Sequence, residues 1–139
     1  MYTHTEKILS VSSTLSNYYF DELTEWKDLT SFYLNEMKSF SLKFINVIHR
    51  NSIIGIAEKV ESHQIRLNHI RDKFNKILRD IKFQESILMF NDNLIDDDRI
   101  TREIEKFQID LRSKIQSVEK EYGDVKFDCY FFLAGVLKK

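Results

Sequence analysis

The sequence predicts an all-α protein, a long antiparallel helical hairpin or coiled-coil-like bundle that is expected to dimerise. Proline is absent, and glycine occurs only at positions 55, 123 and 135. A chain of this length would on average carry roughly seven prolines and about ten glycines, so turn-rich β architectures are disfavoured. Hydrophobic residues make up 42% of the chain, with eleven Phe, which excludes a disordered chain. We expect one helical domain over residues 1–139.

The first predicted helix covers about residues 17–48. Apolar side chains recur there every seven positions, and two more complete the three-four alternation of a helical seam. These residues are Trp26, Tyr33, Phe40 and Val47, with Met37 and Phe44 between them. The spacing places all six on one face of a helix.

The second predicted helix covers residues 52–90 and carries a longer heptad series. Its members are Ile53, Val60, Leu67, Phe74, Ile81 and Leu88. The step from Val47 to Ile53 is six residues, so the seam slips by about 100° within the stretch HRNSIIG. Two interpretations remain open. Either the first helix ends and Asn51 or Ser52 caps a new one, or one long helix bends through a kink near 49–55.

The third predicted helix covers residues 99–138. The stretch NDNLIDDD at 91–98 predicts the loop before it, because Asn and Asp favour turns and N-caps. Acidic residues 96–98 would also suit the N-terminal end of the helix dipole. Apolar residues then keep helical steps from Ile100 to Val136, through Gly123 at a cost of roughly 1 kcal/mol. Phe107 and Tyr122 fall on this seam and should face a partner helix.

Composition and motifs argue against an enzyme, a metal site or a cofactor. The net charge of −1 gives no bulk attraction to nucleic acid. His63 and His69 are six residues apart, whereas helical metal ligands need a spacing of three or four. Cys129 lies on the apolar seam and is expected to be a small buried hydrophobe. No glycine-rich phosphate loop, nucleophile elbow or Cys-x-x-Cys pair occurs in the sequence.

His49 leaves one catalytic alternative open. It stands in INVIHRNSIIGI, where a histidine followed by Arg and Asn resembles the phospho-accepting helix of histidine kinase dimerisation domains. The simpler interpretation is a polar residue at a helix bend. A histidine phosphotransfer hairpin is therefore kept as the third hypothesis.

A basic stretch on the second helix is the main candidate binding feature. Its candidate membrane contacts are Lys59, Arg66, Lys73, Lys76, Arg79 and Lys82. Residues 59, 66 and 73 repeat at seven and therefore share a helix face. This face is either an ordinary solvated surface or a surface attracted to an anionic bilayer, at about 1 kcal/mol per cation.

Two segments resemble sorting-nexin BAR domains. The stretch REIEKFQIDLRSKIQSVEKEYGDVKFDCYFFLAGVLKK is similar to the family's last helix, and YFDELTEWKDLTSFYLNEMKSFSLKFINVIHR is similar to its middle helix. The resemblance implies one bent helix over residues 19–90, a final helix over 99–138 and a remnant of the first helix over 1–16. It also implies a dimeric crescent that binds curved, phosphoinositide-containing endosomal membrane.

The apolar seam is the expected contact surface for a partner helix. The seam for the bundle or for a homo- or heterodimer would consist of Trp26, Tyr33, Phe40, Phe74, Phe107 and Tyr122. No secretory signal is evident, and the apolar run at 129–137 is about half of the roughly 20 residues that a membrane span needs. We expect a cytoplasmic chain, peripheral on endosomal membrane. The main alternative is a helical protein-protein scaffold with no role in lipid binding.

Overall fold

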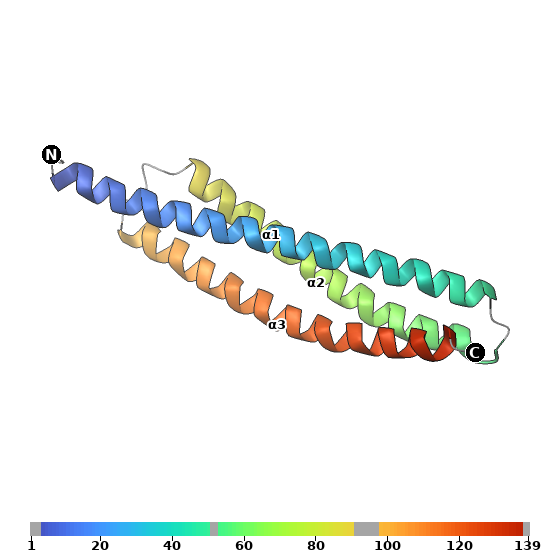
Figure 1. Cartoon of the computed structure of the whole chain (residues 1–139). Helices are drawn as coiled ribbons and strands as arrows, with labels where there is room; N and C mark the ends of the chain where they lie inside the picture. Colours follow the sequence, from blue (N-terminus) through green and yellow to red (C-terminus); the bar gives the residue numbers. More distant parts are fainter. Residues whose placement is uncertain (1–3, 51–52, 91–97, 138–139) are drawn as a thin grey trace. The chain divides into compact units, whose positions relative to one another are not determined.

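The chain is almost entirely helical in the residues that the structure describes. The computed structural model describes the backbone of residues 4–50, 53–90 and 98–137, and the side chains of 15–50, 53–89 and 102–136. Over these ranges it contains helices α1 (His4–Arg50), α2 (Ile56–Phe90) and α3 (Asp98–Leu137), and no strand (Figure 1). The prediction of an all-α helical bundle is confirmed.

Each helix contributes to two compact units. Unit 1 comprises residues 1–29 and 77–115, and unit 2 comprises residues 30–76 and 116–139. Within each unit, the α2 segment runs antiparallel to the segments of α1 and α3, so that α2 and α3 form an antiparallel pair (Figure 1). Three helical segments therefore enclose a core in each unit.

The core of unit 1 combines aliphatic packing with a buried polar network. Its apolar members are Tyr19, Leu23, Ile77, Ile81, Leu88, Ile104, Leu111 and Ile115. Among them lie Gln84 and Gln108, both 0% exposed. Gln84 Nε2 donates to Gln108 Oε1 at 3.1 Å, and Gln108 Nε2 donates to the carbonyl of Tyr19 at 3.2 Å. These bonds tie segments of all three helices together.

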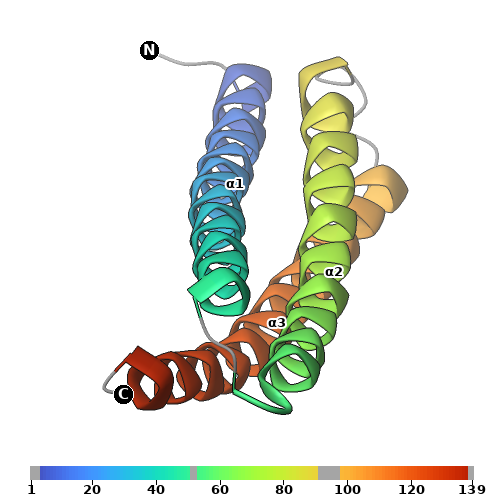
Figure 2. The ribbon, with the colours of Figure 1, turned by 90° about the vertical axis from the view of Figure 1, so that its right-hand side faces the viewer.

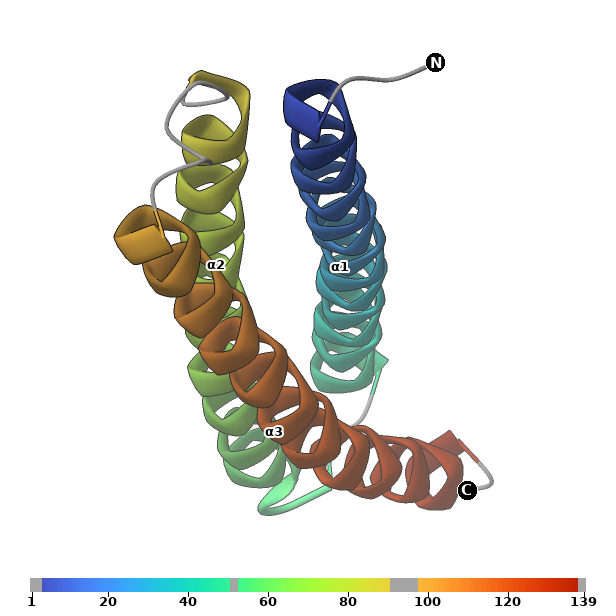
Figure 3. The same ribbon diagram turned by 90° about the vertical axis from the view of Figure 1, so that its left-hand side faces the viewer.

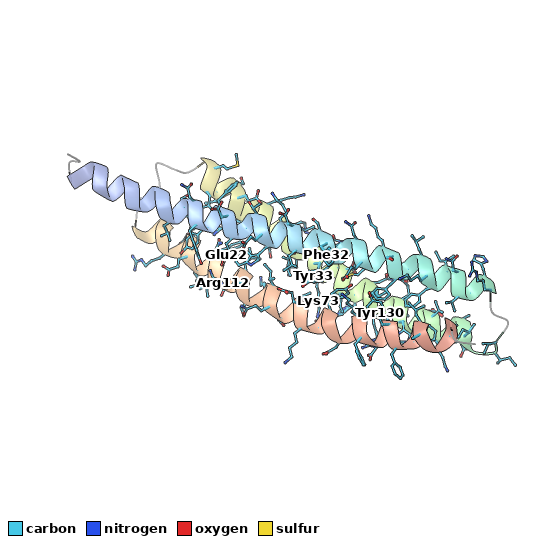
Figure 4. The ribbon with its side chains drawn as sticks, viewed as in Figure 1. Glu22, Phe32, Tyr33, Lys73, Arg112 and Tyr130 are labelled. Carbon is cyan, nitrogen blue, oxygen red and sulfur yellow. The ribbon has the colours of Figure 1, made fainter. Side chains whose placement is uncertain are left out.

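A charged pair extends this network to the surface of unit 1. Gln108 Nε2 also donates to Glu22 Oε1 at 2.9 Å, and the guanidinium of Arg112 binds both oxygens of Glu22, at 2.7 and 3.0 Å. Figure 4 shows Glu22 of α1 and Arg112 of α3 beside each other. The Cζ atom of Arg112 also lies over the ring of Trp26, 5.8 Å from the ring centroid. The bidentate contact between Arg112 and Glu22 makes this a strong ion pair.

The core of unit 2 is aromatic. The ring of Tyr33 lies 5.4 Å from that of Phe74 and 5.2 Å from that of Tyr122, which places one ring from each helix in the same cluster. The other buried apolar residues are Met37, Phe40, Phe44, Val47, Ile56, Val60, Leu67, Ile70, Val118, Val125, Cys129 and Leu133. Burial, with a hydrogen bond to Glu119, raises the pKa of Tyr33 to about 12.

The two helices on either side of HRNSIIG are separate. α1 ends at Arg50 and α2 begins at Ile56, so the alternative of one bent helix over 19–90 is wrong. Gly55 explains the break: its φ of 85° lies in the left-handed region, which an α-helix cannot contain. The Ile56 amide donates to the carbonyl of Ile53 at 3.3 Å, closing a turn before α2 (Figure 2). Ile53 belongs to this turn and is 45% exposed, so its assignment to the second seam was also wrong.

The remaining bounds differ from the predictions by a few residues, except at the start of α1. That helix begins at His4 instead of residue 17, because neither proline nor glycine interrupts the chain before Gly55. α3 passes through Gly123 without a break, as predicted. The predicted capping role of Asn51 or Ser52 lies outside the described residues. So does the predicted loop at 91–98, apart from Asp98, which is the first residue of α3.

Candidate functional site

The predicted seam residues pack inside their own chain. Phe40 and Phe74 are at most 3% exposed, and Tyr122 is 1% exposed. Tyr33 completes the ring cluster of unit 2. Phe107 lies in unit 1, where its ring is 5.7 Å from that of Phe83, and the guanidinium of Arg112 lies over the ring of Trp26. The seam therefore already has partners within the chain.

The basic stretch does not form a uniform cationic face. Arg66 Nη2 lies 2.9 Å from Asp128 Oδ2, and Lys73 Nζ lies 2.7 Å from Glu121 Oε2, so α3 neutralises two of the six cations. Among the described residues, the other four (Lys59, Lys76, Arg79 and Lys82) are exposed and form no ion pair. Lys59, Arg66, Lys73 and Lys76 belong to unit 2, whereas Arg79 and Lys82 belong to unit 1.

Lys59 and Arg66 line an apolar groove in unit 2, which we call the Phe131 groove. It has a volume of about 480 Å³ and lies where the start of α2 meets the end of α3. The residues that line it are Ile53, Ile56, Lys59, His63, Arg66, Asp128, Phe131, Phe132, Gly135 and Val136. The groove therefore combines a mainly apolar lining with two cations and one carboxylate.

His63 is held in the wall of this groove by stacked rings. Its ring centroid lies 4.7 Å from that of Phe132 and 6.1 Å from that of Phe44, both in a stacked arrangement. Nδ1 is buried and has no hydrogen-bond partner among the described residues. Burial lowers the pKa of His63, and the nearby Arg66 lowers it further, against a smaller opposing effect of Asp128. His63 is therefore neutral at neutral pH.

Large apolar side chains are exposed around the Phe131 groove. Ile54, in the turn before α2, is 99% exposed, and Phe131 of α3 is 75% exposed. Phe127 is 68% exposed and stacks on Phe131 with ring centroids 6.3 Å apart. Among the side chains that the structure describes in unit 1, the exposed large apolar ones are Leu15, Tyr18, Phe83, Met89 and Ile109. Contiguous exposed apolar surface beside cations is typical of an interaction site.

A second groove lies between α1 and α2 in unit 2, and we call it the Leu34 groove. It has a volume of about 440 Å³. The residues that line it are Leu34, Met37, Lys38, Ser41, Leu42, Gln64, Leu67, Asn68, Arg71 and Asn75. Figure 3 shows the α1 and α2 ribbons that form its two walls. The sequence pattern predicted neither groove, because each is lined by residues from different helices.

The remaining candidates for a chemical role are Cys129, His49 and possible metal ligands. Cys129 is buried, and burial raises the pKa of its thiol to about 11, so the nucleophilic thiolate is scarce at neutral pH. His49 is exposed in the last turn of α1. Over the described residues, no group of three or more His, Cys, Asp or Glu side chains is placed to hold a metal ion.

Comparison of the chain with protein-family models, with curated proteins and with solved structures gave no match. In the described part of the chain, none of the helices has an apolar stretch long enough to cross a bilayer. The two grooves and the exposed residues beside them are therefore the candidate binding surfaces of the chain.

Proposed function

We propose that the chain is a non-catalytic helical module that attaches to anionic membrane surfaces through the Phe131 groove and the turn beside it. The observation that carries this proposal is that the largely exposed Phe131 lines the groove together with Lys59 and Arg66. Ile54, which follows the lining residue Ile53 in the turn before α2, is 99% exposed. Apolar side chains can enter the acyl region of a bilayer while neighbouring cations remain among anionic headgroups.

The exposure of Ile54 favours a bilayer over a folded protein as the binding surface. Ile54 is 99% exposed in a turn between two helices, and a fully projecting side chain needs a surface that it can penetrate. A fluid bilayer interface accepts such a side chain without a preformed pocket. Phe127 and Phe131 extend the apolar surface along α3.

The expected attachment is reversible. Full burial of a large apolar side chain contributes roughly 1.5–3 kcal/mol, so that Ile54 and Phe131 together contribute about 3–6 kcal/mol. Lys59 adds about 1 kcal/mol near an anionic surface, whereas Arg66 adds less because Asp128 is 2.9 Å away. The sum corresponds to a dissociation constant between about 1 mM and about 10 μM. Pairing of two chains would strengthen attachment through multivalency.

The resemblance to sorting nexins extends the proposal. It implies a homo- or heterodimer and an endosomal, phosphoinositide-containing membrane, and both extensions rest on that resemblance alone. The separate helices α1 and α2 differ from the single bent helix that the resemblance implied for residues 19–90. Membrane attachment does not require one bent helix, because every residue that the proposal assigns to the membrane surface belongs to unit 2.

Vesicle co-sedimentation tests the proposal. Wild-type protein should pellet with vesicles of phosphatidylcholine and phosphatidylserine at low salt, and less with phosphatidylcholine alone. The double variant Ile54→Asp with Phe131→Asp should remain in the supernatant. The double variant Met89→Asp with Ile109→Asp is the matched control, because both residues are at least 50% exposed and belong to unit 1, and it should pellet like wild type.

Two results would contradict membrane attachment. One is wild-type protein that stays in the supernatant with anionic vesicles at low salt. The other is a double variant that pellets as well as wild type while circular dichroism shows the same helix content. Equal loss of binding in the control Met89→Asp with Ile109→Asp would instead assign the effect to added negative charge.

A further inference from the structure

We propose that the Leu34 groove binds an acidic amphipathic helix of a partner protein. This inference concerns a different surface from the membrane proposal, because the Leu34 and Phe131 grooves have no lining residue in common. It is a specific form of the scaffold alternative, since it names the binding surface and the class of partner. Three observations support it: the spacing of the lining residues, the apolar floor and the chemistry of the walls.

Both walls of the groove have the spacing of a helix-packing stripe. On α1 the lining residues are 34, 37, 38, 41 and 42, and on α2 they are 64, 67, 68, 71 and 75. Steps of three and four residues describe one face of a helix. The α1 stripe spans nine residues and the α2 stripe twelve, which separates their end residues by about 12 and 17 Å along the helix axes. Two to three turns of a third helix would match this length.

The floor of the groove is apolar, while one of its edges is open to solvent. Leu67 is 1% exposed and Met37 is 3% exposed, whereas Leu42 is 64% exposed. A helix placed in the groove would cover Leu42 and extend the apolar contact from the floor to the rim. Burial of such side chains at helical spacing is the usual mode of helix-in-groove recognition.

The polar residues of the walls favour an acidic occupant. The lining includes Lys38 and Arg71 and no carboxylate. Lys38 is exposed and forms no ion pair with any residue that the structure describes. Arg71 is only partly compensated, since its contact with Asp72 is 3.3 Å long and both side chains are well exposed. Carboxylates flanking the apolar face of a partner helix could pair with both cations.

Asn68 adds hydrogen-bond donors to the same wall. Its Oδ1 accepts from Gln64 Nε2 at 2.8 Å and from Arg71 Nη1 at 3.3 Å. Because the oxygen is already used twice, the amide N–H groups are what Asn68 can offer to an occupant. With Lys38 and Arg71, the wall is rich in donors and complements a helix that is rich in carboxylate acceptors.

Selection from a displayed library tests this inference. The probe is a library of amphipathic helical peptides with an invariant Leu face and random Glu or Lys at the flanking positions, presented to the full chain without lipid. We expect enrichment of Glu-flanked peptides. Their affinity should fall about tenfold in the double variant Lys38→Glu with Arg71→Glu, which should prefer Lys-flanked peptides.

Matched variants separate this inference from the membrane proposal. The control Lys106→Glu with Lys120→Glu makes the same charge change at exposed positions outside both grooves and should bind the selected peptides like wild type. The variant Ile54→Asp with Phe131→Asp should also keep peptide binding. Loss of vesicle binding with peptide binding intact would then concern the membrane surface alone.

Three outcomes would overturn the inference. The first is a selection that enriches no peptide, and the second is a set of peptides that bind the Lys38→Glu with Arg71→Glu variant unchanged. The third is a dimer of the purified chain, detected by light scattering, that Leu34→Lys with Leu42→Lys converts to a monomer. In that case, the groove is occupied by a second copy and not by an acidic partner.

Discussion

The hydroxyl of Tyr122 donates a hydrogen bond of 2.9 Å to Oε1 of Glu36, a residue 86 positions earlier in the chain. Lys126 Nζ lies 2.9 Å from the other oxygen of the same carboxylate. Tyr122 is 1% exposed, and its burial, with this hydrogen bond, raises its pKa. One carboxylate of α1 therefore fixes two side chains of α3 within unit 2.

A double-mutant cycle should detect this shared carboxylate. Tyr122→Phe should lower the free energy of unfolding by about 1 kcal/mol, and Glu36→Gln should lower it further because Lys126 also loses its partner. The two changes should be non-additive by at least about 0.5 kcal/mol in urea denaturation. Tyr130→Phe is the control, since its ring is 49% exposed, and it should be neutral. Additive effects would show that the hydrogen bond contributes little.

The buried glutamines of unit 1 should be costly to replace. Gln108→Leu removes the donor to the Tyr19 carbonyl and to Glu22 and leaves these acceptors buried or half-buried. We expect a loss of about 2–3 kcal/mol in the free energy of unfolding. Gln116→Leu makes the same change at an exposed position of α3 and should stay within about 0.5 kcal/mol of wild type. Equal effects of the two variants would contradict the network.

Substitution by Ala should have opposite effects on stability at Gly55 and at Gly123. Gly55→Ala should cost about 1–2 kcal/mol, because the φ of 85° forces the new Cβ into a left-handed conformation. Gly123→Ala should stabilise by about 0.5–1 kcal/mol, since its Cβ would meet no atom within 4 Å inside α3. Thermal or urea unfolding measures both. If Gly55→Ala is neutral, the turn before α2 is not left-handed.

The stability of unit 2 should fall below pH 6.5 because of His63. Its folded-state pKa is lowered from 6.5, first by burial and then by Arg66, so the unfolded chain binds the proton more readily. The His63 contribution is fully present above pH 6.5 and is lost as the pH falls from 6.5 through the folded-state value.

A variant isolates this contribution. Besides Arg66 and Asp128, the nearby Lys59 lines the same groove as His63. Urea midpoints should be measured for wild type and His63→Gln from about pH 8 to about pH 5. The wild-type midpoint should fall relative to that of the variant as the pH is lowered, because the variant lacks this proton uptake. Parallel curves for the two proteins would contradict the prediction.

The spacing of apolar residues predicted most of the core, whereas contacts between distant segments could not be predicted. Leu67, Phe74, Ile81 and Leu88 were assigned to a seam by their heptad spacing, and all four are buried. Gln84 and Gln108 occupy the same helical steps as their apolar neighbours, so the spacing carried a signal that their polarity concealed. A buried amide needs partners, and these come from segments far apart in the sequence.

The candidate site was harder to predict for the same reason. The basic stretch of α2 identified Lys59 and Arg66, but not the position of Asp128, 62 residues after Arg66, whose carboxylate reduces the net charge of the groove. Within the run CYFFLAGVL, the helical steps assigned Cys129, Phe132 and Val136 to the seam. In the structure Leu133 is buried while Phe131 is 75% exposed, because a helix turns successive apolar side chains to different sides.

Alkylation of the single cysteine can measure how often unit 2 opens. Cys129 is 0% exposed, and burial raises the pKa of its thiol to about 11, so an alkylating reagent can reach the thiolate only when α3 separates from its neighbours. The labelling rate divided by that of the unfolded chain gives the fraction of time that unit 2 is open. Every substitution in unit 2 can be assessed in this way without an added probe.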